Sequence, residues 1–124
     1  MEERFYYCKD CGGIFGLIHS EQPSCCCKSA LMPIAPKRAE TGAEKHLPKV
    51  AVLKDRVLVD VGEIAHPMES AHHIGWIYLQ TNRGGQRKTL VPQQPPRAEF
   101  ALLEERPLAV YAYCNQHGLW KIEL

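Results

Sequence analysis

The chain has 124 residues, enough for one ordinary domain or for a very small domain joined to one of about 85 to 90 residues. Its 15 Lys and Arg residues nearly balance its 14 Asp and Glu residues, so the formal net charge is +1 and no bulk charge favours nucleic acid or a membrane surface. No apolar run approaches the roughly 18 residues of a membrane span, and the acidic start does not resemble a signal peptide. We therefore expect a soluble, cytoplasmic protein without a nucleic-acid or membrane partner.

Five of the six cysteines fall within residues 8–27. In a reducing compartment, clustered cysteines more often bind metal than form disulfides. Cys8 and Cys11 have C-x-x-C spacing and precede two glycines, which is typical of a metal-binding knuckle. The other half of a four-thiolate site must come from three consecutive residues: Cys25, Cys26 and Cys27.

Residues 1–36 are too few to bury enough apolar surface unaided, so we expect a metal-stapled domain there, with strands at 5–7 and 14–19. Zinc and iron both accept four thiolates, and the spacing does not separate them. His19 falls in this domain and is expected to be structural or exposed.

Residues 33–48 are proline-rich and are interpreted as a linker leading into a loop. Short alternating segments then predict strands at 50–54, 57–61, 74–80, 87–90, 98–103 and 108–113. Six or seven short strands and no convincing helix indicate an all-β fold. We expect an antiparallel, immunoglobulin-like sandwich over residues 37–124.

The sixth cysteine, Cys114, lies three positions before His117, and a loop of this length can direct both side chains at one metal ion. Further imidazole donors lie upstream, at expected strand ends or loops: His46, His66, His72 and His73. A single histidine is more often an exposed or hydrogen-bonded residue than a ligand, so their joint placement carries the prediction. In an extended segment His72 and His73 point to opposite faces, so only one of them should bind; His72 shares a face with Ile74 and Trp76.

Four imidazoles and one thiolate exceed a closed zinc site and favour a metal that accepts five or six ligands, such as iron, copper or nickel. A thiolate opposite an open position directs electron density to whatever binds there, which suits reduction of a small oxygen species. Glu44 and Lys45 precede His46 and offer a carboxylate cap and an anion-attracting cation. From spacing alone, a solvated loop pair is the favoured interpretation of these two residues.

Several motifs then resemble one family, in order and over nearly the whole chain: Cys8-x-x-Cys11 with adjacent cysteines near 26, Glu44-Lys45-His46-Leu47-Pro48, Ala65-His66-Pro67-Met68-Glu69, His72-x-Ile74-x-Trp76 and Tyr113-Cys114-Asn115-x-His117-Gly118-Leu119-Trp120. Together they resemble desulfoferrodoxin, the two-iron form of superoxide reductase. The chain departs from the family in having three consecutive cysteines rather than two, no Gly after them, and His73 where an aromatic residue is usual.

The resemblance implies a desulforedoxin-like domain, also similar to rubredoxin, at 1–36 and an immunoglobulin-like catalytic domain at 37–124. It implies two iron ions per chain. The first has four thiolate ligands, with Cys25 as an alternative member and zinc as a possible substitute: Cys8, Cys11, Cys26 and Cys27. The second, catalytic ion has four equatorial imidazoles and an axial thiolate: His46, His66, His72, His117 and Cys114.

The resemblance further implies one-electron reduction of superoxide to hydrogen peroxide, with rubredoxin or a similar donor restoring the ferrous state, in a homodimer. Glu44 then binds the ferric ion, and Lys45 attracts superoxide and stabilises the peroxide that forms. Two alternatives stay open: a rubredoxin-like electron carrier, and a zinc-ribbon binding module fused to a β-sandwich. Iron content and visible colour separate them from the reductase.

Overall fold

The computed structural model describes residues 5–18, 31–39 and 42–124. The chain divides into two compact units, Met1–Ala35 and Pro36–Leu124, and each is considered by itself. Within the described residues, no helix has the length and apolar character needed to cross a membrane.

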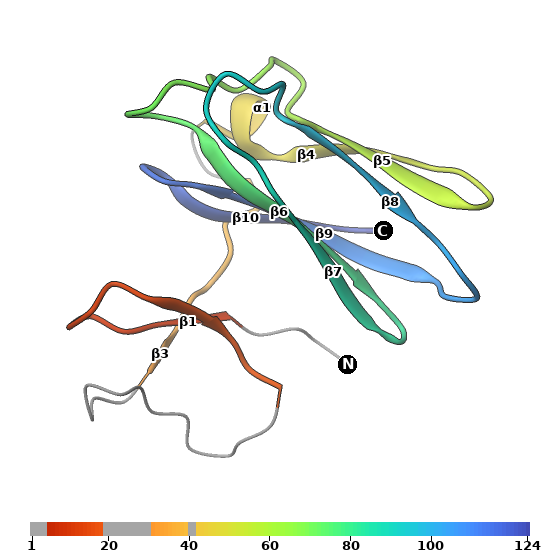
Figure 1. Ribbon diagram of the computed structural model, residues 1–124, viewed down its shortest axis with the longest axis horizontal. Coiled ribbons are helices and arrows are strands. Elements are labelled where there is room, and N and C mark those ends of the chain that lie inside the picture. The colour runs from red at the N-terminus through yellow and green to blue at the C-terminus, as the bar shows by residue number, and fades with distance from the viewer. Residues whose placement is uncertain (1–4, 19–30, 40–41) are drawn as a thin grey trace. The chain divides into compact units, whose positions relative to one another are not determined.

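In the first unit, three short antiparallel strands form one sheet in the order β2-β1-β3 (Figure 1). These are β1 (Phe5–Tyr7), β2 (Ile14–Gly16) and β3 (Met32–Pro33). The turn between β1 and β2 is closed by two backbone hydrogen bonds, from the amide of Cys8 to the Gly13 carbonyl and from that of Gly12 to the Cys8 carbonyl. Gly12 has a φ of 74°, which favours glycine. His19 and residues 25–27 lie outside the described residues.

The second unit is a sandwich of two antiparallel sheets (Figure 1). One sheet has the order β4-β5-β8 and consists of β4 (Pro48–Val52), β5 (Arg56–Val61) and β8 (Arg97–Ala101). The other has the order β10-β9-β6-β7 and consists of β6 (Ile74–Thr81), β7 (Gly84–Thr89), β9 (Pro107–Cys114) and β10 (Gly118–Glu123). The expected all-β fold class is thus confirmed.

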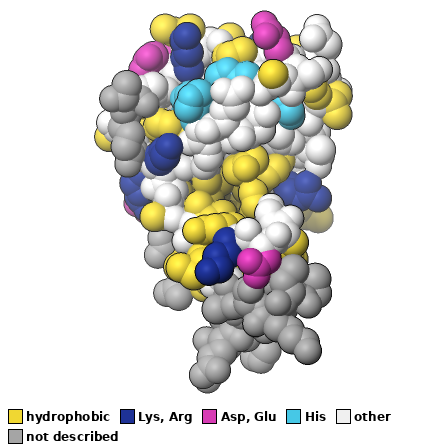
Figure 2. Space-filling model, turned by 90° about the vertical axis from the view of Figure 1, so that its left-hand side faces the viewer, with side chains coloured by type: hydrophobic (Ala, Val, Ile, Leu, Met, Phe, Trp, Pro, Cys, Tyr) yellow, Lys and Arg dark blue, Asp and Glu magenta, His cyan; other side chains and the backbone are white. Residues whose placement is uncertain are grey.

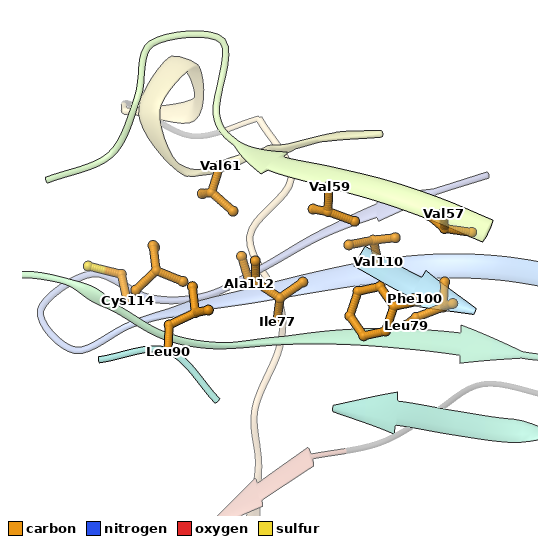
Figure 3. Packing of buried hydrophobic residues seen from close by; sticks show 11 residues of the cluster. Val57, Val59, Val61, Ile77, Leu79, Leu90, Phe100, Val110, Ala112 and Cys114 are labelled. Atoms are coloured by element: carbon orange, nitrogen blue, oxygen red, sulfur yellow. The ribbon is translucent and has the colours of Figure 1, made fainter. Parts of the chain in front are cut away.

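Apolar side chains from the two sheets meet between them and form the core (Figure 3). Alternation along β5 turns Val57, Val59 and Val61 inward, since successive side chains of a strand point to opposite faces. The facing sheet contributes Ile77 and Leu79 from β6 and further residues from β9. Cys114 lies at one end of this core and is completely buried.

A β-bulge at the start of β6 changes which side chains share a face. The pairing of β6 with β9 shifts between Ile74 and Trp76. Ile74 therefore joins Ile77 in the core, whereas Trp76 stacks on Tyr113 outside it, with ring centroids 5.5 Å apart. The expectation that Ile74 and Trp76 share a face is wrong, because one extra residue in a strand reverses the alternation that follows.

Two elements differ from the sequence-based expectations. A single-turn helix, α1 (Ala43–His46), interrupts the expected loop, and strand β10 follows the Cys114–His117 turn. Strand pairing also brings the ligand candidates to one end of the sandwich. The start of β4 pairs with the end of β5, as Pro48 opposite Val61, and the start of β6 pairs with the end of β9, as Ile74 opposite Cys114.

Candidate metal centre

Five side chains converge at the end of the sandwich that carries α1, where histidines reach the molecular surface (Figure 2). We call them the His-Cys cluster: His46, His66, His72, Cys114 and His117. One donor atom from each residue lies within 4.8 Å of all the others. Metal bonds to imidazole and thiolate of about 2.0–2.3 Å place opposite ligands roughly 4–4.6 Å apart, so the cluster has the size of a shell around one ion.

The four imidazoles form a closed ring. Neighbouring ring centroids lie 4.7 Å apart for His46 with His66 and for His66 with His72. The separations are 4.9 Å for His72 with His117 and for His117 with His46. The diagonal from His46 to His72 is 6.4 Å. The four sides are nearly equal and this diagonal is longer, so the imidazoles surround a common centre and do not stack on one another.

Backbone carbonyls fix the tautomers of the two buried histidines. Nδ1 of His46 lies 2.8 Å from the carbonyl oxygen of Gly42, and Nδ1 of His66 lies 2.7 Å from that of Pro67. A carbonyl oxygen only accepts hydrogen bonds, so each Nδ1 carries the proton and donates. The lone pair of each ring is therefore on Nε2, the arrangement that metal-binding histidines use.

The same two Nε2 atoms are buried and, among the described residues, have no hydrogen-bond partner. Leaving a buried polar atom unsatisfied costs about 1–3 kcal/mol, so two of them facing one point require an explanation. A metal ion at the centre of the His-Cys cluster supplies it. The donor set and the geometry thus fit a bound metal.

Burial keeps these rings neutral at physiological pH. It lowers the pKa of His66 to about 4, and it is also the main cause of the lowered pKa values of His46 and His72. Neighbouring positive groups lower them further, among them Lys37 for His46 and Lys45 for His72. A neutral imidazole binds a metal ion without first losing a proton.

The thiol of Cys114 lies next to the ring of His117. The Sγ atom is 3.7 Å from Nδ1 of His117 and accepts a hydrogen bond of 3.4 Å from the backbone amide of the same residue. A hydrogen bond to the sulfur stabilises its anionic form, and the turn that provides this bond also supplies one imidazole of the His-Cys cluster. Gly118 ends the turn with a φ of 82°, a conformation that side chains disfavour.

Burial differs between the two halves of the cluster. His46 and His66 are 5% and 3% exposed, whereas His72 is half-buried and His117 is exposed. Glu44 and Lys45 lie on α1 directly before His46, and both are exposed. A small anion can therefore reach the cluster from the side of His72 and His117.

Asn115 is a supporting residue that the sequence analysis does not identify. Its Oδ1 accepts the backbone amide of His73 at 2.9 Å, and its Nδ2 donates to the carbonyl of Ala71 at 3.1 Å. It thereby ties the segment carrying His72 to the Cys114–His117 turn. Asn often bonds nearby backbone in turns, but sequence alone does not show which distant segment accepts it.

His73 does not belong to the cluster. Its Nδ1 lies 3.1 Å from the carbonyl oxygen of Glu69 and donates to it. In the first unit, Cys8 is buried and Cys11 is exposed on the knuckle. The remaining candidates for the first metal, Cys25, Cys26 and Cys27, lie outside the described residues.

Comparison with known proteins gives consistent matches. The profile of the desulfoferrodoxin family matches residues 38–123, a range that contains the whole His-Cys cluster. A desulfoferrodoxin homolog of Archaeoglobus fulgidus is 38% identical over 117 residues, covering 94% of this chain and 93% of the relative. A superoxide reductase of Pyrococcus horikoshii is 38% identical over 99 residues, covering 65% and 86%. The structure of the superoxide reductase from Treponema pallidum matches with a TM-score of 0.80 at 34% identity, covering 98% of this chain and 97% of that one.

Proposed function

The chain belongs to the desulfoferrodoxin family, and we propose that it reduces superoxide to hydrogen peroxide at an iron ion held by the His-Cys cluster. The observation that carries this proposal is the group of four imidazoles and one buried thiol whose donor atoms all lie within 4.8 Å of one another. This donor set exceeds a four-ligand zinc site and suits a redox-active ion. When bound, ferrous iron supplies the single electron that, with two protons, converts superoxide into hydrogen peroxide.

Each of the chain's own residues has a distinct part in this function. Cys114 provides a thiolate shielded from water, with its charge moderated by the amide of His117. The buried pair His46 and His66, locked by backbone carbonyls, fixes where the ion sits. His72 and His117 complete the donor set on the side open to solvent.

Lys45 attracts the anionic substrate. Lys45 is exposed on α1, and its positive charge contributes to the lowered pKa of His72. The charge therefore acts on the exposed side of the cluster. A cation beside an open site raises the local concentration of an anion, an effect that salt screens. Glu44, the preceding residue, would provide a carboxylate as a further ligand for iron in the ferric state.

The first unit is proposed to hold a second iron through Cys8, Cys11, Cys26 and Cys27, with zinc as a substitute. The support is the closed knuckle that presents Cys8 and Cys11. If Cys26 and Cys27 are the ligands, Cys25→Ser retains the first metal whereas Cys26→Ser and Cys27→Ser lose it. Retention by Cys27→Ser and loss by Cys25→Ser would instead identify Cys25 and Cys26 as the pair.

Rubredoxin or a similar small carrier is proposed as electron donor, and a cytoplasmic homodimer as the working form. Pulse radiolysis of the ferrous protein tests the central reaction. Superoxide should oxidise the protein with formation of hydrogen peroxide and without release of oxygen. Oxygen released in the ratio of a dismutase, or a colourless zinc protein with no reaction, would refute the proposal.

A further inference from the structure

Lys37 reaches the metal centre from a segment that supplies no ligand. It forms an isolated parallel bridge with Trp120 of β10. Its amide donates to the carbonyl of Leu119 at 2.8 Å, and its carbonyl accepts the amide of Lys121 at 3.0 Å. These bonds on both sides of Trp120 fix the backbone of Lys37, so its side chain starts from a defined position.

The Lys37 side chain is directed at a proposed iron ligand. Its Nζ donates a hydrogen bond of 2.9 Å to the carbonyl of His117 and lies 5.5 Å from the centre of the Trp120 ring. The indole Nε1 of Trp120 donates to the same carbonyl at 3.2 Å. One charged and one neutral donor therefore share this carbonyl, and the aromatic ring adds a cation–π contact.

Trp120 connects Lys37 to a second ligand. The indole is 1% exposed and stacks on the ring of His46, with centroids 4.6 Å apart and planes inclined by 11°. The pair of Lys37 and Trp120 thus contacts two of the four imidazole-bearing residues, His46 and His117, and places a fixed positive charge beside them.

We propose that Lys37 is an electrostatic positioning residue whose ammonium group, held by Trp120 and the His117 carbonyl, stabilises the ferrous over the ferric state of the bound iron. This inference rests on the proposed function, because it takes iron as the resident metal. A nearby cation repels the ferric ion more strongly than the ferrous ion, so the charge should raise the reduction potential. Lys37 lies one residue before the range that the family profile matches.

Nζ of Lys37 lies 5.5 Å from the centre of the Trp120 ring, which lies 4.6 Å from the centre of the His46 ring. Nζ is therefore within about 10 Å of the His46 ring centre. The energy of one unit charge over this distance depends on the effective dielectric constant, which is about 80 in water and about 20 near a protein surface. Between these limits, the charge of Lys37 changes the ferrous-to-ferric ratio at fixed potential by about twofold to twentyfold. For a one-electron couple this is a shift of about 20–75 mV.

A redox titration of the iron-loaded full chain tests the proposal without superoxide, following the visible ferric-thiolate absorption expected from Cys114. Lys37→Met removes both charge and donor, Lys37→Gln keeps a donor for the His117 carbonyl, and Lys37→Arg keeps both. The matched control is Lys54→Met, which removes an exposed lysine from the β4–β5 turn at the other end of the sandwich (Figure 1). We expect Lys37→Met and Lys37→Gln to lower the midpoint potential by about 20–75 mV, and Lys37→Arg and Lys54→Met to leave it unchanged.

A wild-type potential in Lys37→Gln with full iron content would overturn the proposal, whether or not Lys37→Met shifts it, because the hydrogen bond rather than the charge would then matter. Loss of iron from both uncharged variants would also overturn it, since a residue that biases the oxidation state leaves the ligands in place. Neither result touches the proposed function, which pulse radiolysis of the wild-type ferrous protein tests separately.

Discussion

Gly62 lies against the segment that carries Glu44 and Lys45, and Gly62→Ala tests how tightly that segment is held. A Cβ atom at this position would lie 2.8 Å from the carbonyl oxygen of Leu47 and 2.9 Å from that of Glu44. It would also lie 3.0 Å from the carbonyl carbon of Lys45. All three atoms belong to the backbone, so no side-chain rotation can relieve the contacts and the segment itself must move.

The expected cost follows from these contacts. Overpacking of this kind costs about 1–3 kcal/mol, partly offset by the about 0.4–1 kcal/mol that Gly→Ala gains through the unfolded chain. A net loss of about 1–2 kcal/mol lowers the melting temperature of a domain of this size by roughly 5–15 °C. Because the displaced segment carries Lys45 and His46, the rate constant for superoxide should also fall, by about tenfold or more.

Tryptophan fluorescence during thermal unfolding is a suitable assay, because both tryptophans, Trp76 and Trp120, lie in the second unit. Gly75→Ala is the matched control. A Cβ there meets only Tyr113 Cδ2 at 3.8 Å, an ordinary contact, so its melting temperature should stay near that of the wild type. The reasoning is refuted if Gly62→Ala and Gly75→Ala melt at the same temperature.

Three further predictions concern the metal centre. Lys45→Ala should lower the rate constant for superoxide and weaken its dependence on ionic strength, because a cation that attracts the anion is lost. Lys54→Ala, far from the cluster, should change neither. An unaltered salt dependence in Lys45→Ala would show that Lys45 does not attract superoxide. Cys114→Ser should abolish the visible ferric-thiolate absorption, and a persistent band would exclude Cys114 as ligand. Removal of iron by a chelator should lower the melting temperature of the second unit, because the buried Nε2 atoms of His46 and His66 lose their partner. Metal at about a thousandfold above its Kd stabilises the folded state by about 4 kcal/mol. Equal melting temperatures with and without iron would argue against a metal site.

The sandwich could be predicted from the sequence wherever one face of a strand is buried and the other is solvated. Along β5, Val57, Val59 and Val61 are buried and every second residue is more exposed, as expected for a strand with one face in the core. Strand β10 lacks this signal, because Leu119, Trp120 and Lys121 are all buried although they are consecutive. Helix α1 is a single turn, too short to show a helical period.

The donor types of the candidate site could be read from the sequence, but their arrangement depends on backbone detail. The choice of His72 over His73 relied on uninterrupted alternation into β6, whereas a bulge interrupts it at Gly75. What holds the segment instead is Asn115, which binds the backbone of Ala71 and His73. Likewise, no spacing rule reveals that the carbonyls of Gly42 and Pro67 select the tautomers of the buried histidines.

The His-Cys cluster therefore has two halves that should respond differently to substitution. His46 and His66 are buried, and each is oriented by a carbonyl close to it in the sequence, so changes there should act mainly on metal affinity. His72 and His117 are more exposed and are held by side chains from elsewhere, Asn115 and Lys37, so changes to those supports should act mainly on reactivity. With a metal ion bound, the buried half would hold it in place, and the exposed half would leave a solvent-borne anion a way to the site.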